Sequence, residues 1–113
     1  MSRQASGLKA WIYQRASAIY MILFIPYVIG YFMYSPPSDH ADWQAWVSHP
    51  LISLCLILFF ASMLIHAWIG IRDVLIDYVH PVTARYIVLG FFAFVLIACA
   101  GWAMQIIMLA HAG

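Results

Sequence analysis

Charged residues are scarce in this sequence of 113 residues, where aspartate, glutamate, lysine and arginine make up only 8%. Hydrophobic residues make up 66%, a balance that soluble domains of this size do not show. Charge-free stretches run from Ala16 up to Asp39, from Trp43 to Ile71 and from Tyr86 to the C-terminus. Each exceeds the about 20 residues that a helix needs to cross a hydrocarbon core. The sequence therefore predicts an all-α integral membrane protein with three transmembrane helices.

Cysteine is also rare, because Cys55 and Cys99 are the only two in the chain. Both fall inside hydrophobic segments, without metal-ligand spacing, so we expect them to be inert packing residues. The sequence has neither a glycine-rich nucleotide-binding turn nor a cysteine cluster, which excludes flavin and iron–sulfur clusters from this chain. Its net charge is only +1, so we expect no nucleic-acid partner.

The expected helices form a single membrane-anchor domain that covers 1–113. They run from about 13 to 34, from 49 to 77 and from 82 to 110. Pro26 should bend the first helix, because proline removes a backbone donor and its ring clashes one turn back. Trp43 and Trp46 favour a short surface helix in the first connection, at the membrane interface.

Basic residues predict the orientation in the membrane. Arg3, Lys9 and Arg15 precede the first hydrophobic segment, and Arg72 and Arg85 flank the second connection. By the positive-inside rule, the N-terminus lies inside and the C-terminus outside. The first segment is too long for a signal-peptide core, so we expect the mature protein to retain it. Because each helix is apolar around most of its circumference, we also expect this anchor to pack against partner subunits.

His66 is an ionisable residue inside a hydrophobic segment, six residues before Arg72 and so roughly 9 Å below the inner surface. A neutral imidazole bonded to a neighbouring helix and a functional group are both compatible with this depth. Ser62 and Gly70 lie one turn before and after His66 on the same helical face. Small residues there would admit a flat porphyrin whose iron binds the imidazole, or equally a close helix contact.

A membrane haem held by two histidines needs a second ligand. His80 follows His66 by fourteen residues and so shares its helical face, but it lies outside the hydrocarbon because charged residues intervene and Pro81 follows. If His66 binds haem, the second histidine must therefore come from another chain. We assign no role to His80.

Polar groups gather on the expected inner side. Tyr78 can donate a hydrogen bond to a carbonyl oxygen, and Asp77 beside it can orient the phenol or supply protons from water. Either residue could instead serve only the membrane interface. Arg15 is a topology signal or, if His66 holds haem, a guanidinium that pairs with a haem propionate.

Two segments together resemble a known family. The stretch "RASAIYMILFIPYVIGYF" from Arg15 and the stretch "LIHAWIGIRDVLIDYVHP" from Leu64 resemble the small hydrophobic membrane anchor of succinate dehydrogenase, respiratory complex II. The resemblance covers the three-helix layout from end to end. The second motif is the more specific, with histidine, aromatic, glycine and then Asp-Tyr-Val and a basic residue before the third helix.

The resemblance implies a membrane anchor formed with a second hydrophobic anchor subunit. Together they would dock a flavoprotein and an iron–sulfur protein on the inner side, and FAD and the iron–sulfur clusters would belong to those partners. Succinate would be oxidised at the flavin, and electrons would reduce ubiquinone near the inner surface, linking the citric acid cycle to the respiratory chain. A haem b would lie between the two anchor subunits. This chain would have no catalytic activity alone, and we expect it in a bacterial cytoplasmic membrane rather than a mitochondrial inner membrane.

Position by position, the resemblance makes His66 one axial haem ligand. With a haem on His66, the small residues Ser62 and Gly70 on the same helical face would pack near it. It places Arg15 near the haem propionates. Tyr78 would bond a quinone carbonyl with support from Asp77.

Two other functions are compatible with the residues alone. A small proton or solute transporter would use His66 as a relay, with Asp73 and Asp77 at its inner mouth. No other ionisable residue lies deeper than His66, so such a path would need water or a partner chain. A structural anchor without a cofactor would use His66 only for packing.

Overall fold

The computed structural model describes residues 3–112, and their side chains from Gly7 onward. Its helices are α1 (Arg3–Tyr34), α2 (His40–Ser48), α3 (Pro50–Tyr78) and α4 (Val82–Ala112). The described residues include no strand. Gly7–Tyr34 of α1, all of α3 and all of α4 are long and apolar enough to cross a membrane. The prediction of an all-α integral membrane protein with three spans is confirmed.

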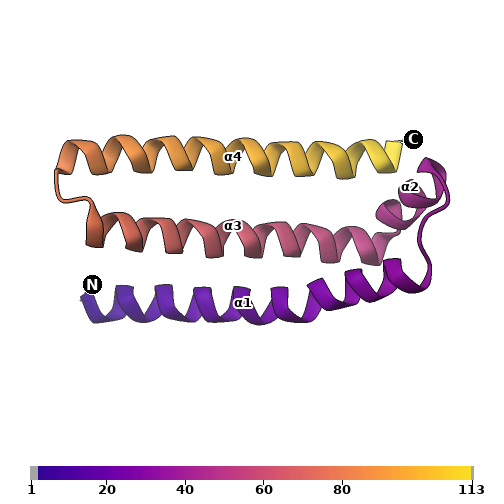
Figure 1. The fold of residues 1–113 in the computed structure, drawn as a ribbon, viewed down its shortest axis with the longest axis horizontal. Helices are drawn as coiled ribbons and strands as arrows, with labels where there is room; N and C mark the ends of the chain where they lie inside the picture. Colours follow the sequence, from indigo (N-terminus) through magenta and orange to yellow (C-terminus); the bar gives the residue numbers. More distant parts are fainter. Residues whose placement is uncertain (1–2, 113) are drawn as a thin grey trace.

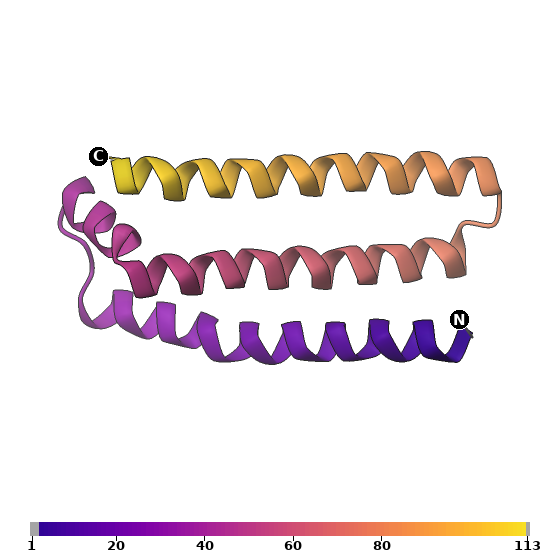
Figure 2. The ribbon, with the colours of Figure 1, turned by 180° about the vertical axis from the view of Figure 1, so that it is seen from behind.

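The three long helices lie in a row, with α3 between α1 and α4 (Figure 1). In the described part of the chain, no Cα atom of α1 lies within 8 Å of a Cα atom of α4. The same order is seen from behind (Figure 2). The N-terminus and the α3–α4 connection lie at one end of the row, which we call the N end; α2 and the C-terminus lie at the other, the C end. Along most of its length, α3 therefore contacts α1 on one side and α4 on the opposite side, and its two remaining sides are not covered by another long helix of this chain.

The first helix is longer than the hydrophobic pattern predicts. It begins at Arg3 rather than near Tyr13, because the residues before Tyr13 include no proline and Gly7 alone does not interrupt the helix. The expected bounds followed the hydrophobic span, whereas the hydrogen-bonded helix continues beyond it. Pro26 lies inside α1, and the ribbon changes direction in the half of α1 nearer Tyr34 (Figures 1 and 2).

Contacts between α1 and α3 repeat along α3 at helical spacing. The hydroxyl of Tyr20 donates to the Cys55 carbonyl at 2.6 Å, and the rings of Phe24 and Phe59 lie 5.2 Å apart. Nearer the N end, His66 lies on the same face of α3 and contacts Ser17 of α1. One face of α3 is thus committed to α1.

Two aspartate side chains form the N-terminal cap of the short helix α2. The carboxylate of Asp39 accepts from the Asp42 amide at 2.9 Å, and Asp42 in turn accepts from the hydroxyl and amide of Ser38 at 2.5 and 3.2 Å. The side-chain hydrogen bond and then the backbone hydrogen bond from Ser38 lower the pKa of the exposed Asp42 carboxyl from its usual value.

The C end contains a small core where α2, α3 and α4 meet. Val47, Ile107 and Ala110 are buried together. Buried Ser53 donates to the Val47 carbonyl at 2.5 Å, so its oxygen accepts from the Nε2–H of His111 at 2.6 Å. These bonds join the end of α4 to α2 and α3.

Candidate functional site

His66 lies on the face of α3 that packs against α1. Its Nδ1 atom is 3.3 Å from the Oγ of Ser17 and 3.4 Å from the backbone oxygen of Gln14. Ser17 is only 5% exposed, and its hydroxyl donates to the same Gln14 oxygen at 2.9 Å. A serine hydroxyl and a backbone carbonyl from α1 therefore surround one nitrogen of the imidazole.

The hydrogen-bond pattern assigns the proton on the ring. Ser17 has one hydroxyl proton, and Gln14 receives it, so the Ser17 oxygen can only accept from His66. The Gln14 carbonyl is also an acceptor. Nδ1 consequently carries the hydrogen, and in the neutral ring Nε2 keeps its lone pair. Among the side chains described, from Gly7 to Ala112, none forms a hydrogen bond with Nε2.

This tautomer suits a metal ligand. Histidines that bind a metal through one nitrogen usually donate the other N–H to a carbonyl, a carboxylate or water, which fixes the orientation of the ring. The residues around His66 therefore fit an iron-bound imidazole. The described chain holds no group of three or more histidine, cysteine, aspartate or glutamate residues that could bind a metal ion by itself.

The small residues that flank His66 have different surroundings. A Cβ atom added to Gly70 would lie 3.8 Å from the side-chain nitrogen of Gln14, so α1 covers this glycine closely. Ser62 is half-buried. At Gly70 the neighbour from α1 is the Gln14 side chain, at an ordinary contact distance.

Asp77 and Tyr78 lie at the N end, where α3 finishes. Both are exposed, and 77% of the surface of Tyr78 is accessible. Arg72 pairs with its neighbour Asp73 at 3.2 Å, so this carboxylate is already engaged. His80 is exposed in the α3–α4 connection. The structure thus separates a half-buried group at His66 from an exposed group at Tyr78.

Arg15 is not part of the His66 group within this chain. It precedes Ser17 by two residues, which is about 200° around a helix, so it lies on the side of α1 away from α3. Its side chain is exposed, and its guanidinium carbon lies 5.3 Å from the centre of the Trp11 ring. Any contact of Arg15 with a propionate would have to form on that outer side of α1.

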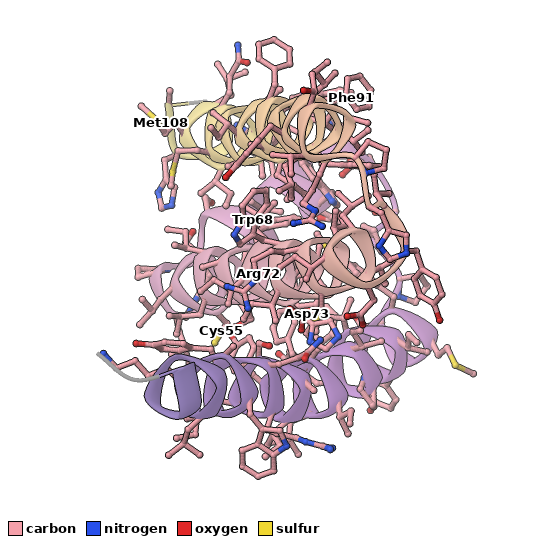
Figure 3. The ribbon with its side chains drawn as sticks, turned by 90° about the vertical axis from the view of Figure 1, so that its left-hand side faces the viewer. Cys55, Trp68, Arg72, Asp73, Phe91 and Met108 are labelled. Carbon is pink, nitrogen blue, oxygen red and sulfur yellow. The ribbon has the colours of Figure 1, made fainter. Side chains whose placement is uncertain are left out.

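A groove of about 720 Å³ runs along one open side of α3, nearer the N end, and the sequence did not predict it. Its walls come from α1, α3 and α4, and include Tyr13, Trp68 and Leu96. From the N end, Trp68 and Arg72 are seen on this side of α3, whereas Cys55 and Asp73 lie between α3 and α1 (Figure 3). The groove is almost entirely apolar, so it suits a hydrophobic occupant.

Ser17 and Gln14 were also not predicted as neighbours of His66. A serine in a charge-free span is a usable signal, since small polar side chains in membrane helices often bond across to a neighbouring helix. The backbone oxygen of Gln14 leaves no such signal. Only the pairing of α1 with α3 identifies it.

Comparison with known proteins decides the family. The family model for the succinate dehydrogenase/fumarate reductase transmembrane subunit matches residues 1–100. This chain belongs to that family. The anchor is also similar to the succinate dehydrogenase hydrophobic membrane anchor subunit of Coxiella burnetii, with 26% identity over 105 residues that cover 93% of this chain and 91% of the relative.

The family assignment confirms the main functional prediction. The chain is a membrane anchor subunit of a succinate dehydrogenase/fumarate reductase complex. It is a multi-pass membrane protein that takes part in an oxidoreductase complex together with other subunits. The transporter alternative is therefore not needed to explain its three helices.

Proposed function

We propose that this anchor subunit supplies one axial ligand of a haem b and part of a quinone-reduction site. His66 would be the ligand, and Tyr78 with Asp77 would contribute to the quinone site. The complex would sit in a bacterial cytoplasmic membrane, with the N end of the row inside. A second hydrophobic anchor subunit, an iron–sulfur subunit and a flavoprotein subunit would complete it, and this chain alone would have no activity.

The contacts of His66 Nδ1 with the Ser17 hydroxyl and the Gln14 carbonyl are the observation that carries the haem part. Nδ1–H is held by acceptors on α1, so the lone pair of Nε2 is available to iron. A bound haem supplies one-electron chemistry, with its potential set by the axial ligands and their hydrogen bonds. Because this chain offers no second histidine at that depth, the other ligand would come from the second anchor subunit. Ser62 and Gly70 would lie beside the haem.

Arg15 would contact a haem propionate. Its guanidinium is exposed on the outer side of α1 and forms no ion pair within residues 7–112. A guanidinium bonds a carboxylate through two parallel hydrogen bonds, which suits a propionate. For this contact, a haem held by His66 would have to extend past α1 to its outer side.

The quinone part is supported by the exposure and position of Tyr78. Its hydroxyl can donate a hydrogen bond to a quinone carbonyl oxygen at the membrane surface. The carboxylate of Asp77 is exposed and can pass protons from water to the reduced quinone. Electrons would arrive from the iron–sulfur subunit, so the phenol and carboxylate only bind the ring and deliver protons.

The test of the haem ligand uses the purified complex. His66→Ala should abolish or strongly shift the b-type bands in reduced-minus-oxidised absorption spectra, because one iron ligand is lost. His40→Ala is the matched control, since His40 is exposed at the C end beside Trp43, and it should leave the bands unchanged. Unchanged bands in His66→Ala would show that the anchor uses this histidine only for packing.

A further inference from the structure

Arg85 forms a hydrogen bond across the connection between α3 and α4. Its Nε atom donates to the Val79 carbonyl at 3.1 Å, and its own amide donates to the Pro81 carbonyl at 3.0 Å. The Val79 amide donates to Leu75 at 2.9 Å. Both the amide and the carbonyl of Val79 are therefore hydrogen-bonded, and Arg85 is the donor to the carbonyl.

The place of Arg85 along the chain is unusual for a cation. It lies in the first turn of α4, where the helix dipole disfavours positive charge. The last carbonyls of a helix lack partners within the helix and favour a basic residue nearby. The last turn of α3 contains no basic residue of its own. Arg85 supplies this missing donor to α3 from the next helix.

We propose that Arg85 is a positioning residue for Tyr78. Val79 follows Tyr78 directly, and the hydroxyl of Tyr78 has no hydrogen bond within the described chain. The position of this exposed ring therefore depends on the backbone conformation at the end of α3. By fixing the Val79 carbonyl, Arg85 limits fraying of the last turn of α3 and keeps the phenol where a quinone carbonyl can meet it. This inference rests on the proposed role of Tyr78 at the quinone site.

The test measures quinone reduction by the intact complex with a short-chain ubiquinone analogue. Arg85→Met keeps an unbranched apolar stem but removes the guanidinium that donates to the Val79 carbonyl. The apparent KM for the quinone should therefore rise roughly tenfold. Arg85→Leu, which also lacks a side-chain donor, is a second variant, should the first fail to assemble. Arg72→Met is the matched control, because Arg72 is a cation at the same end whose partner is its own neighbour Asp73, and it should leave the KM unchanged. Haem bands and succinate oxidation by a soluble dye report assembly.

A double variant separates positioning from a general structural role. If Arg85 acts through Tyr78, then Arg85→Met should add little to the effect of Tyr78→Phe. Fully additive effects, or an unchanged KM in both assembled Arg85 variants, would overturn the inference. If Tyr78→Phe raises the KM and the Arg85 variants do not, only the role of Arg85 is wrong. If Tyr78→Phe changes nothing, the proposed quinone site itself is wrong.

Discussion

At the scale of single residues, His66 shows how one proton decides what a side chain can do. An imidazole in a membrane helix can donate from either nitrogen, and the two forms offer different atoms to a ligand. The acceptors on α1, Ser17 Oγ and the Gln14 carbonyl, hold the hydrogen on Nδ1. The same atoms satisfy a purely structural histidine, so a spectrum of the complex, rather than geometry, distinguishes the two roles.

Tyr78 gives the residue-scale prediction for the quinone site. Tyr78→Phe removes the hydroxyl but keeps the ring, so kcat/KM for quinone reduction should fall roughly tenfold through the loss of one hydrogen bond. Succinate oxidation by an artificial soluble acceptor should persist, because it does not use this site. Assays of both activities on the same preparation provide the measurement.

The control for this substitution is Tyr86→Phe. Tyr86 is exposed to a similar degree, 70% against 77%, and lies near the start of α4 on the other side of the same connection. It should leave both activities unchanged. Equal loss of both activities in Tyr78→Phe would indicate faulty assembly and would contradict a quinone-specific role.

At the scale of helices, one face of α3 serves both packing and the candidate haem ligand. Cys55, Phe59, His66 and Gly70 recur four or seven residues apart, and each meets α1. Gln14 takes part in two of these contacts, because its side chain lies beside Gly70 and its backbone oxygen lies beside His66. A bulky side chain at position 70 would therefore displace the residue that contacts the imidazole.

Substitutions of Gly70 test this link. Gly70→Ala should be tolerated, because its Cβ would lie at an ordinary contact distance of 3.8 Å from Gln14. Gly70→Leu should separate the helices, cost about 1–3 kcal/mol through overpacking and reduce the haem content of the purified complex. Haem per flavin is the measurement. Gly101→Leu is the control, since a Cβ added to Gly101 of α4 meets nothing within 4 Å of the described chain.

Loss of haem in both leucine variants would point to general disruption of the membrane helices. Normal haem content in Gly70→Leu would contradict the link between this contact and His66. Because alanine and leucine differ only in size here, the comparison isolates the close approach of α1.

At the scale of the whole molecule, the row of helices leaves much of the chain without intramolecular cover. Only 6% of the apolar window of α3 and none of that of α4 is buried within the chain. Lipid can cover apolar side chains, but it offers no specific packing. The apolar groove beside Trp68 and the exposed phenol of Tyr78 both lie on surfaces that a partner subunit can complete.

Purification from the native membrane tests this directly. We expect the chain to be isolated with three others: a second hydrophobic anchor, an iron–sulfur protein and a flavoprotein. Mass spectrometry of the detergent-solubilised complex is the measurement, and a succinate-reducible b-type spectrum should accompany it. Isolation of the chain alone, with proton or ion flux after reconstitution, would instead favour a transporter.

The sequence by itself determined the three spans and the connection at Pro81. These depend on hydrophobicity, charge and helical rise, which are properties of neighbouring residues along the chain. Only the tertiary structure decided that α3 lies in the middle, that Ser17 and Gln14 face His66, and that Arg85 reaches Val79. Helices that are apolar all round do not encode in their periodicity which neighbour they face. Contacts between residues distant in sequence settle that choice, and they assign the proton of His66.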